Sequence, residues 1–407
     1  MSFLRKILYI YKSDGAIVLF KRIVRKIITY YENSFEFLKD TFGYTATRYT
    51  PKSLYINSYL KGELDGVMKL DQDIINNFLN HKFNLLGSDW VEVAYGINCS
   101  GHIGKNYSVL HKPKIDSEGQ WLKERLNYSS FKQAKEVWKY VDSSYKPIDW
   151  QLDFKSGYRW SEHTWHKSIT FLDKQGVDIK VPWELARMQH LPMLARQYVA
   201  EQTTDKEKKA LYFEFRNQIL DFIATNPRNR GVNWTCSMDI AIRAANWLLA
   251  YDIFALGGCK YDPEFKKIFS ESIFCHGKHI FENLEWNFGD RGNHYLTNIC
   301  GLIFIGCYLS NNLHAREWLS FSIEEFTQEI DHQFYDEGSN FEGSTAYHLL
   351  TSEMILYATS LLLGFNAQEA VNLDKKTDIK SYAILERKLK KLFSKDFFQK
   401  LHKISNF

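Results

Sequence analysis

The chain has 407 residues, of which 45% are hydrophobic and 25% are charged, and its formal net charge is +4. This composition is typical of a globular protein with a sizeable core, and it excludes a chain that is disordered throughout. No stretch reaches the roughly 18 consecutive apolar residues that a membrane span needs. The N-terminus does not resemble a signal peptide, because Lys12 and Asp14 interrupt its apolar run and no small-residue cleavage site follows.

Positive charge gathers at the two ends of the chain. Residues 1–31 hold seven basic side chains and one acidic side chain, and residues 375–403 hold ten basic and three acidic ones. The rest of the chain is therefore negative, which counts against a broad basic groove, and we predict no nucleic-acid partner. The basic N-terminus suggests contact with an anionic membrane surface, although a solvated helix explains it equally well.

Cysteine usage favours a reducing compartment. The six cysteines show no framework of regular spacings in so long a chain. Cys300 and Cys307 lie two helical turns apart, about 10 Å, which is too far for a disulfide. We therefore predict a cytoplasmic protein, peripheral to the inner face of the membrane if its N-terminus binds there.

The predicted elements fall into three regions in chain order. Residues 1–150 form a basic helix and a mixed α/β lead-in, in which residues 90–93 are a candidate short strand. Residues 151–372 carry apolar residues at helical spacing, separated by short loops with Gly, Asn or Pro, which predicts successive antiparallel helices wrapped into an incomplete (α/α) toroid. Residues 373–407 predict one basic amphipathic helix, with Leu385, Leu389, Leu392 and Phe393 on its apolar face. The fold class is thus all-α, with a small mixed N-terminal region.

Three apolar stripes at helical spacing support the helical prediction. They are Tyr212, Phe215, Ile219 and Phe222; Met238, Ala241, Ile242, Ala245 and Leu249; and Leu319, Ile323, Phe326 and Ile330.

Proton-handling side chains follow glycine-bearing loops at two predicted helix starts. Asn293 and His294 open one helix, and Tyr347 opens another, 54 residues after Asn293. An amide and an imidazole can bind a carboxylate and the enolate-like charge that forms when the proton beside it is removed. A tyrosine can act as base or acid when a neighbouring cation stabilises its phenolate. These groups suit β-elimination at a uronic acid.

Six stretches of the chain, taken in order, resemble the heparinase II/III family of polysaccharide lyases, specifically its N-terminal helical toroid domain. They are FNLLG (83–87), IDWQLDF (148–154), WELARMQHL (183–191), the stretch 233–247 that begins with NW and ends with IRAANW, GNH (292–294) and DEGSNFEGSTAYH (336–348). The resemblance implies that Asn293 neutralises the uronate carboxylate, that His294 assists, and that Tyr347 is the acid and in some members also the base. It also implies an acidic polysaccharide as the partner.

The family pattern continues with a β-sandwich domain that supplies a further catalytic histidine, whereas this sequence ends at Phe407. From the sequence we therefore expect a truncated and weakly active lyase domain, or one that a partner chain with a β-sandwich completes.

Further polar residues are candidates for substrate binding. Asp239, Arg243 and Asn246 share one face of a predicted helix, which lines the toroid cavity or is simply exposed. The other candidates lie in the same motifs and are Arg187, His190, Asn233, Trp234, Arg291, Glu342 and His348. For Asn293 the alternative is a helix N-cap, and for His294 a buried structural histidine.

We predict no metal and no cofactor. Cys275, His276 and His279 suggest a metal site only weakly, because two histidines three residues apart have no acidic partner nearby.

Two other functions remain open. An inverting (α/α) glycoside hydrolase would use two carboxylates from Asp336, Glu337 and Glu342. A non-catalytic carbohydrate-binding protein of polysaccharide biosynthesis would bind glycan without turnover. We favour the lyase.

Overall fold

The computed structural model describes residues 31, 33–38, 40, 64, 66–170, 174–286, 291–365 and 379–407. The chain divides into two compact units, Met1–Arg48 and Tyr49–Phe407. In the first unit, residues 31, 33–38 and 40 are helical. The predicted basic N-terminal helix, whose charges lie in residues 1–31, falls outside the described residues apart from Tyr31. The boundaries predicted at residues 150 and 372 both fall inside the second unit and stay predictions.

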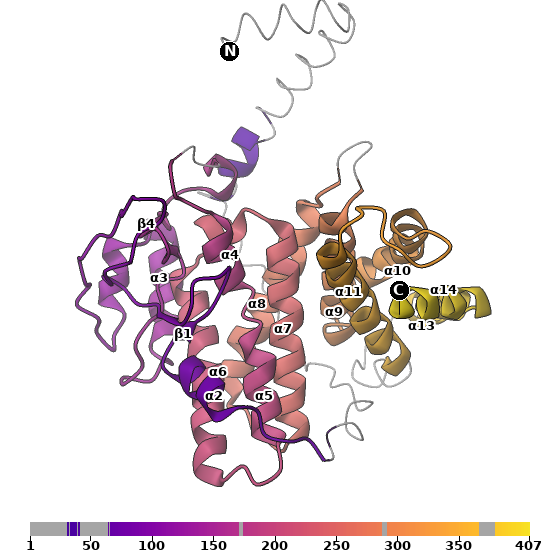
Figure 1. The fold of residues 1–407 in the computed structure, drawn as a ribbon, viewed down its shortest axis with the longest axis horizontal. Coiled ribbons are helices and arrows are strands. Elements are labelled where there is room, and N and C mark those ends of the chain that lie inside the picture. Colours follow the sequence, from indigo (N-terminus) through magenta and orange to yellow (C-terminus); the bar gives the residue numbers. More distant parts are fainter. Residues whose placement is uncertain are drawn as a thin grey trace, which may run out of the picture. The chain divides into compact units, whose positions relative to one another are not determined.

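The second unit is built mostly from helices (Figure 1). In chain order its elements are α2 (Gln72–Leu79), β1 (Lys82–Phe83), β2 (Val91–Glu92), η2 (Gln120–Glu124), α3 (Tyr128–Trp138), β3 (Leu152–Asp153), β4 (Tyr158–Arg159), η3 (His166–Ser168), α4 (Lys180–Ala186), α5 (His190–Val199), α6 (Asp205–Thr225), η4 (Val232–Trp234), α7 (Ser237–Leu256), α8 (Pro263–Glu282), α9 (Asn293–Tyr308), α10 (Leu313–Gln333), α11 (Thr345–Gly364), α13 (Ile379–Leu392) and α14 (Lys395–Asn406).

The strands form two short antiparallel ribbons, and both lie before the long helices. β1 pairs with β2, with Phe83 opposite Val91, and β3 pairs with β4, with Leu152 opposite Arg159. The predicted strand at residues 90–93 is confirmed as β2. The all-α class with a small mixed N-terminal region is therefore confirmed as well.

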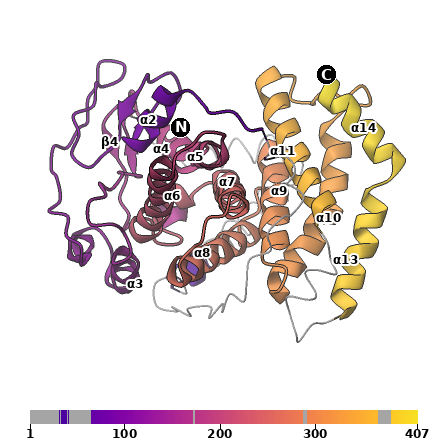
Figure 2. The same cartoon turned by 90° about the horizontal axis from the view of Figure 1, so that it is seen from below.

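The long helices pack in succession as an incomplete (α/α) toroid, as the apolar stripes predict (Figure 2). Helix α7 packs against α5, α8 and α9, and α9 packs in turn against α10 and α11. The stripe side chains Phe215, Ile323 and Phe326 are buried in this core. Helix α6 begins at a capping box, in which the Thr204 side chain and Glu207 satisfy each other's backbone N–H groups.

Helices α7 and α9 approach closely because glycine and alanine face each other. A Cβ atom added to Gly301 would lie 2.5 Å from the Cβ of Ala241. This contact allows the first turn of α9 to lie beside the N-terminus of α7. It therefore brings the 292–294 motif close to residues that directly follow the 233–234 motif.

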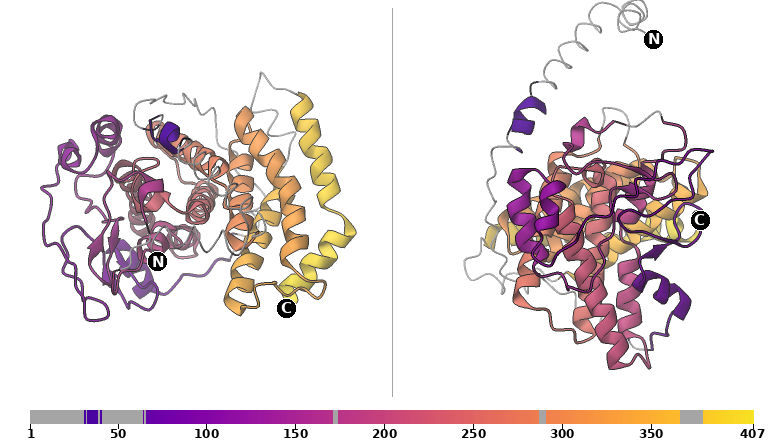
Figure 3. Two further views of the ribbon diagram at one scale, coloured as in Figure 1. Left: turned by 90° about the horizontal axis from the view of Figure 1, so that it is seen from above. Right: turned by 90° about the vertical axis from the view of Figure 1, so that its left-hand side faces the viewer.

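The C-terminal segment differs from the prediction of one helix. It forms α13 and α14, which pack on α10 and α11 and form the yellow edge of the ribbon in Figure 3. The helix is interrupted between Leu392 and Lys395. The hydroxyl of Ser394 accepts a hydrogen bond from the backbone N–H of Phe397 and so caps α14. The predicted apolar face is confirmed, because Leu385, Leu389 and Leu392 are buried.

None of the helices in the described part of the chain is both long and apolar enough to cross a membrane. All six cysteines are free, as their spacings predict.

Candidate functional site

The two glycine-bearing junctions meet through Asn293 and Glu342. Helix α9 begins at Asn293, and its N-cap is Gly292, so the alternative that Asn293 is itself the N-cap is wrong. The Nδ2 group of Asn293 donates to both carboxylate oxygens of Glu342, at 2.9 Å each, and its backbone N–H donates to Oε1 at 3.1 Å. Glu342 thus serves as a cap that reaches α9 from the loop before α11. Oδ1 of Asn293 is buried and has no hydrogen-bond partner among the described residues.

His294 is held by an acidic residue that the sequence analysis did not identify. Its Nδ1 atom lies 3.0 Å from Oε1 of Glu285, in the loop after α8, and its side chain is 50% exposed. The hydrogen bond to Glu285 raises the pKa of His294. Burial raises the pKa of the Glu285 carboxyl, but hydrogen bonds from His294 and two further donors outweigh burial and leave that pKa lowered. The imidazole is therefore fixed at Nδ1, and its Nε2 atom remains for a ligand.

The thiol of Cys236 completes this group from the N-terminus of α7. Its Sγ atom lies 3.5 Å from Oε1 of Glu285 and 3.9 Å from Nδ1 of His294. In the described part of the chain, these three side chains form a group whose potential ligand atoms all lie within 4.8 Å of one another.

Arg187 and Asp239 lie close enough to His294 to influence its charge. The Nε group of Arg187 donates to Asp239 at 2.5 Å, and its Nη1 group pairs with Glu184 at 2.5 Å. The Asp239 carboxylate raises the pKa of His294, while the Arg187 guanidinium lowers it. The structure thus brings Arg187 and Asp239 to the same region as His294, although each is already ion-paired.

Arg291 is ion-paired just before α9. Its Nη1 group lies 3.1 Å from Oε1 of the buried Glu329, and its guanidinium lies over the Trp286 ring at 5.1 Å. Gln333 donates to the other oxygen of Glu329 and to the carbonyl of Gly292. These contacts fix the backbone that leads into Asn293.

Tyr347 and its neighbour His348 differ in their surroundings. Tyr347 lies in the first turn of α11, its side chain is 45% exposed, and its hydroxyl has no hydrogen-bond partner among the described residues. His348 packs between the rings of Phe334 and Phe407, and its Nε2 atom contacts Ser352 at 3.3 Å. None of these side-chain contacts of His348 is to Asn293.

Four other predicted residues are buried, and two of their polar atoms, Oδ1 of Asn233 and Nη1 of Arg243, have no hydrogen-bond partner among the described residues. His190 contacts Gln218 at 2.6 Å, and burial lowers its pKa to about 4. Asn233 donates to the carbonyl of Trp150, and Trp234 donates to the carbonyl of Asn226. Arg243 donates to His276 at 2.9 Å, and burial lowers its pKa to about 9. Arg243 has no exposed surface, so the expectation that it lines a cavity or faces solvent is wrong.

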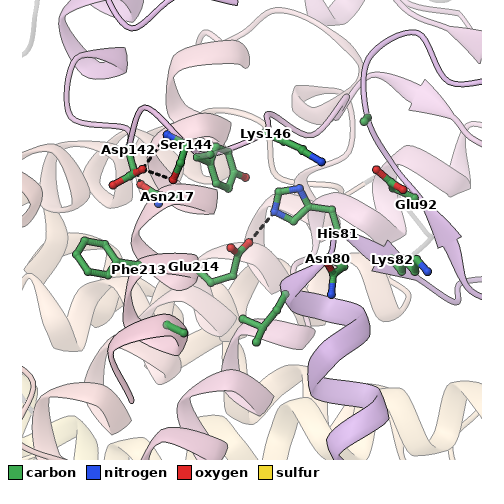
Figure 4. A pocket seen from close by; sticks show the side chains of 14 residues that line it. Asn80, His81, Lys82, Glu92, Asp142, Ser144, Lys146, Phe213, Glu214 and Asn217 are labelled. Carbon is green, nitrogen blue, oxygen red and sulfur yellow. Dashed lines mark hydrogen bonds and ion pairs between the residues drawn. The ribbon is translucent and has the colours of Figure 1, made fainter. Parts of the chain in front are cut away.

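A separate pocket of about 700 Å³ lies between the end of α2 and helix α6 (Figure 4). In it His81 Nε2 lies 2.8 Å from Oε1 of Glu214. Its lining shares no residue with the predicted site. Burial raises the pKa of Tyr145, which lines this pocket, well above its usual value.

Cys236 and Glu285 are the residues of the site that the sequence analysis missed. Cys236 follows the 233–234 motif by two residues, and Glu285 precedes His294 by nine. An acidic residue in the loop before the candidate histidine is the one available signal, and it is a weak one. Their meeting depends on the packing of α7 and α9, which no local pattern encodes.

Known proteins resemble this chain over part of their length. The heparin-sulfate lyase of Bacteroides stercoris is 23% identical over 211 residues, which are 46% of this chain and 30% of that protein. Two solved structures, of the heparinase III BT4657 gene product and of the heparan sulfate lyase HepC from Pedobacter heparinus, are each 17% identical with TM-scores of 0.36. The matched region is 41% of each of these two proteins, and it is 69% and 70% of this chain, respectively. The chain thus spans less than half the length of each of these proteins.

The family described as Heparinase II/III N-terminus has a model that matches residues 100–387. This range contains five of the six motifs that carry the resemblance, and it is well over half of the chain. The protein therefore belongs to the heparinase II/III family, through the N-terminal domain of that family.

Proposed function

We propose that this chain is the helical toroid of a polysaccharide lyase that cleaves a uronate-containing polysaccharide by β-elimination. The observation that carries the proposal is the contact between Asn293 and Glu342, because it joins the two junctions that hold Asn293, His294 and Tyr347. A lyase needs neutral or cationic donors at the substrate carboxylate and a proton-handling group beside them. Family membership supports this reaction class.

In the proposed reaction, a base removes the proton beside the uronate carboxylate, a carbon–carbon double bond forms, and the glycosidic bond to the leaving oxygen breaks. Tyr347 protonates that oxygen and thus acts as the acid. His294, whose Nδ1 atom faces Glu285, donates from Nε2 to the carboxylate when it is protonated. Both Nδ2 contacts of Asn293 go to Glu342, so a substrate carboxylate that binds this amide must exchange with Glu342.

The hydrolase alternative receives less support. An inverting hydrolase needs a carboxylic acid with a raised pKa. Hydrogen bonding with Ser339 instead lowers the pKa of Glu337, and Glu342 is bound to the amide of Asn293. The non-catalytic alternative has one observation in its favour, which is that no cation pairs with Tyr347 among the described contacts.

A substrate screen in oxygen-18 water separates these functions. The full chain is incubated with a panel of uronate polysaccharides, and products are followed by ultraviolet absorbance and mass spectrometry. The lyase proposal expects absorbing, unsaturated products without the heavy oxygen. Heavy oxygen at the new reducing end would establish hydrolysis, and glycan binding without any product would establish the non-catalytic function.

We also propose a cytoplasmic location, with the basic N-terminus at the membrane surface. The six free cysteines support the reducing compartment.

A further inference from the structure

We propose that Cys236, Glu285 and His294 form a binding site for a divalent cation of the zinc type. A thiol, a carboxylate and an imidazole are the three side chains that zinc prefers, and here they come from three different segments of the chain. Cys236 precedes α7, Glu285 follows α8, and His294 lies in the first turn of α9. The site shares His294 with the proposed lyase machinery, but binding of the ion needs no substrate and can be tested separately.

The distances between the ligand atoms fit tetrahedral coordination. Bond lengths of about 2.3 Å to sulfur and about 2.0–2.2 Å to nitrogen and oxygen place two tetrahedral ligands roughly 3.3–3.6 Å apart. The observed separations are 3.0 Å from Nδ1 to Oε1, 3.5 Å from Sγ to Oε1, and 3.9 Å from Sγ to Nδ1. Each is within a few tenths of an ångström of the required value.

The carboxylate ligand is fixed by hydrogen bonds to its second oxygen, as ligands of metal sites usually are. Oε2 of Glu285 accepts the backbone N–H of Met238 at 2.7 Å and Nδ2 of Asn298 at 3.2 Å. The backbone N–H of Glu285 donates to Oδ1 of Asn298 at 2.8 Å, which fixes the loop as well. Oε1 is left to face the thiol and the imidazole.

Burial and charge also suit a cation with one open position. Cys236 is 4% exposed, whereas the His294 side chain is half exposed, so an ion bound between them would keep a path to solvent. Three protein ligands leave a fourth position for water or an anionic ligand. Asp239 adds a negative charge near both Cys236 and His294, and Arg187, with which it is ion-paired, adds a positive charge near His294.

Protons compete with the ion at this site. Burial raises the pKa of the Cys236 thiol strongly, and the charges of Asp239 and Glu285 raise it further. Metal binding must therefore displace the thiol proton, because the thiolate is the ligand. Asp239 also raises the pKa of His294, whereas Arg187 lowers it. Binding of the ion should therefore release the thiol proton.

Calorimetry and cobalt spectroscopy on the full chain test the site. After treatment with a chelator, zinc chloride should bind with one ion per chain, and the heat should differ between buffers of different ionisation enthalpy. Cobalt should give the absorption of a tetrahedral thiolate complex. Cys236→Ser should abolish that thiolate absorption and weaken zinc binding at least tenfold.

Cys259→Ser is the matched control, because it removes a half-buried thiol from the loop after α7 and should leave both signals unchanged. If Cys236→Ser fails to fold, His294→Ala tests the same site, since that side chain is half exposed. The proposal is overturned if either site variant binds zinc as tightly as the parent, or if the thiolate absorption disappears in Cys259→Ser. None of these results depends on lyase turnover, so a failed metal site leaves the proposed function untouched.

Discussion

Glu285 gives His294 a defined orientation and charge at the proposed site. Its Oε1 atom faces Nδ1 of the imidazole, and its Oε2 atom is tied to the backbone of α7 and the side chain of Asn298. Without such a partner the half-exposed imidazole could rotate freely. The carboxylate therefore acts as a positioning group that leaves Nε2 for the ligand.

Replacing Tyr347 by Phe should abolish most turnover while binding is retained. Loss of a general acid typically lowers kcat by about a hundredfold to ten-thousandfold. The rate of formation of unsaturated product measures kcat, and titration with a uronate oligosaccharide measures binding. Tyr357→Phe is the control, because Tyr357 lies on the same helix with the same 45% exposure and its hydroxyl donates to Glu353. Equal rates in both variants would remove Tyr347 from the mechanism.

The pKa of His294 should fall when Glu285 is replaced by Gln. The hydrogen bond to Glu285 is the largest cause of its raised pKa, and the loss of that bond should lower the pKa. Proton resonances of the imidazole, followed against pH by NMR, give the value directly. An unchanged pKa in Glu285→Gln would contradict the pairing.

The same pair sets a pH window for stability. His294 has a raised pKa when folded, so its contribution is fully present below the ordinary value of 6.5 and is lost as pH rises through the raised value. The lowered pKa of Glu285 gives a contribution that is present above its ordinary value of 4.5 and is lost as pH falls through the lowered one. Urea unfolding at several pH values should show that the extra free energy of unfolding between about pH 4.5 and pH 6.5 is lost in Glu285→Gln.

For single residues, the sequence shows which candidate side chains are polar or proton-handling. It does not show how deeply each side chain is buried or which residues it contacts. Asn293 lies at a helix start, as its motif predicts, because glycine before a polar run is a local signal. Arg243 and His190 are equally polar in sequence, yet the packing of distant segments buries them. The partners of Asn293 and His294 lie 49 and 9 residues away and depend on tertiary contacts.

At the scale of elements, the contact between α7 and α9 determines whether the site forms. Gly301→Ala should destabilise the fold by about 1–3 kcal/mol, because the added methyl group overlaps Ala241. Urea unfolding measures the loss. Ala241→Gly in the same chain should recover part of it despite the lower helix propensity of glycine. Additive effects of the two substitutions would show that the helices are not in contact there.

Helix identity could be predicted well because apolar spacing is a local property. The stripes of α6, α7 and α10 all fall on buried faces. The break between α13 and α14 was missed, since the apolar spacing continues through it. Ser394 is a local signal for the start of a new helix, but it is hard to recognise within a continuous run of lysines and leucines.

At the scale of the whole molecule, charge predicts how the protein binds an acidic glycan. Arg187 and Arg291 are both ion-paired, and the chain between the two basic ends is negative. A broad basic groove on a polyanion such as DNA loses about a thousandfold or more in affinity between 50 and 200 mM salt. We expect a loss of about tenfold or less, measured by titration with a uronate polysaccharide.

The basic C-terminal helices provide the control for that measurement. Lys390→Gln and Lys395→Gln remove exposed charges from α13 and α14 and should leave the salt dependence unchanged. A steep salt dependence that these variants flatten would place binding on the C-terminal helices instead of at α9.

The most direct test of the proposed function is a crystal structure of Tyr347→Phe with a bound uronate oligosaccharide. One uronate carboxylate should lie within hydrogen-bond distance of Asn293 or His294, with the ring of residue 347 beside the same sugar. A sugar bound in the pocket of His81 and Glu214, or out of reach of residue 347, would contradict the account.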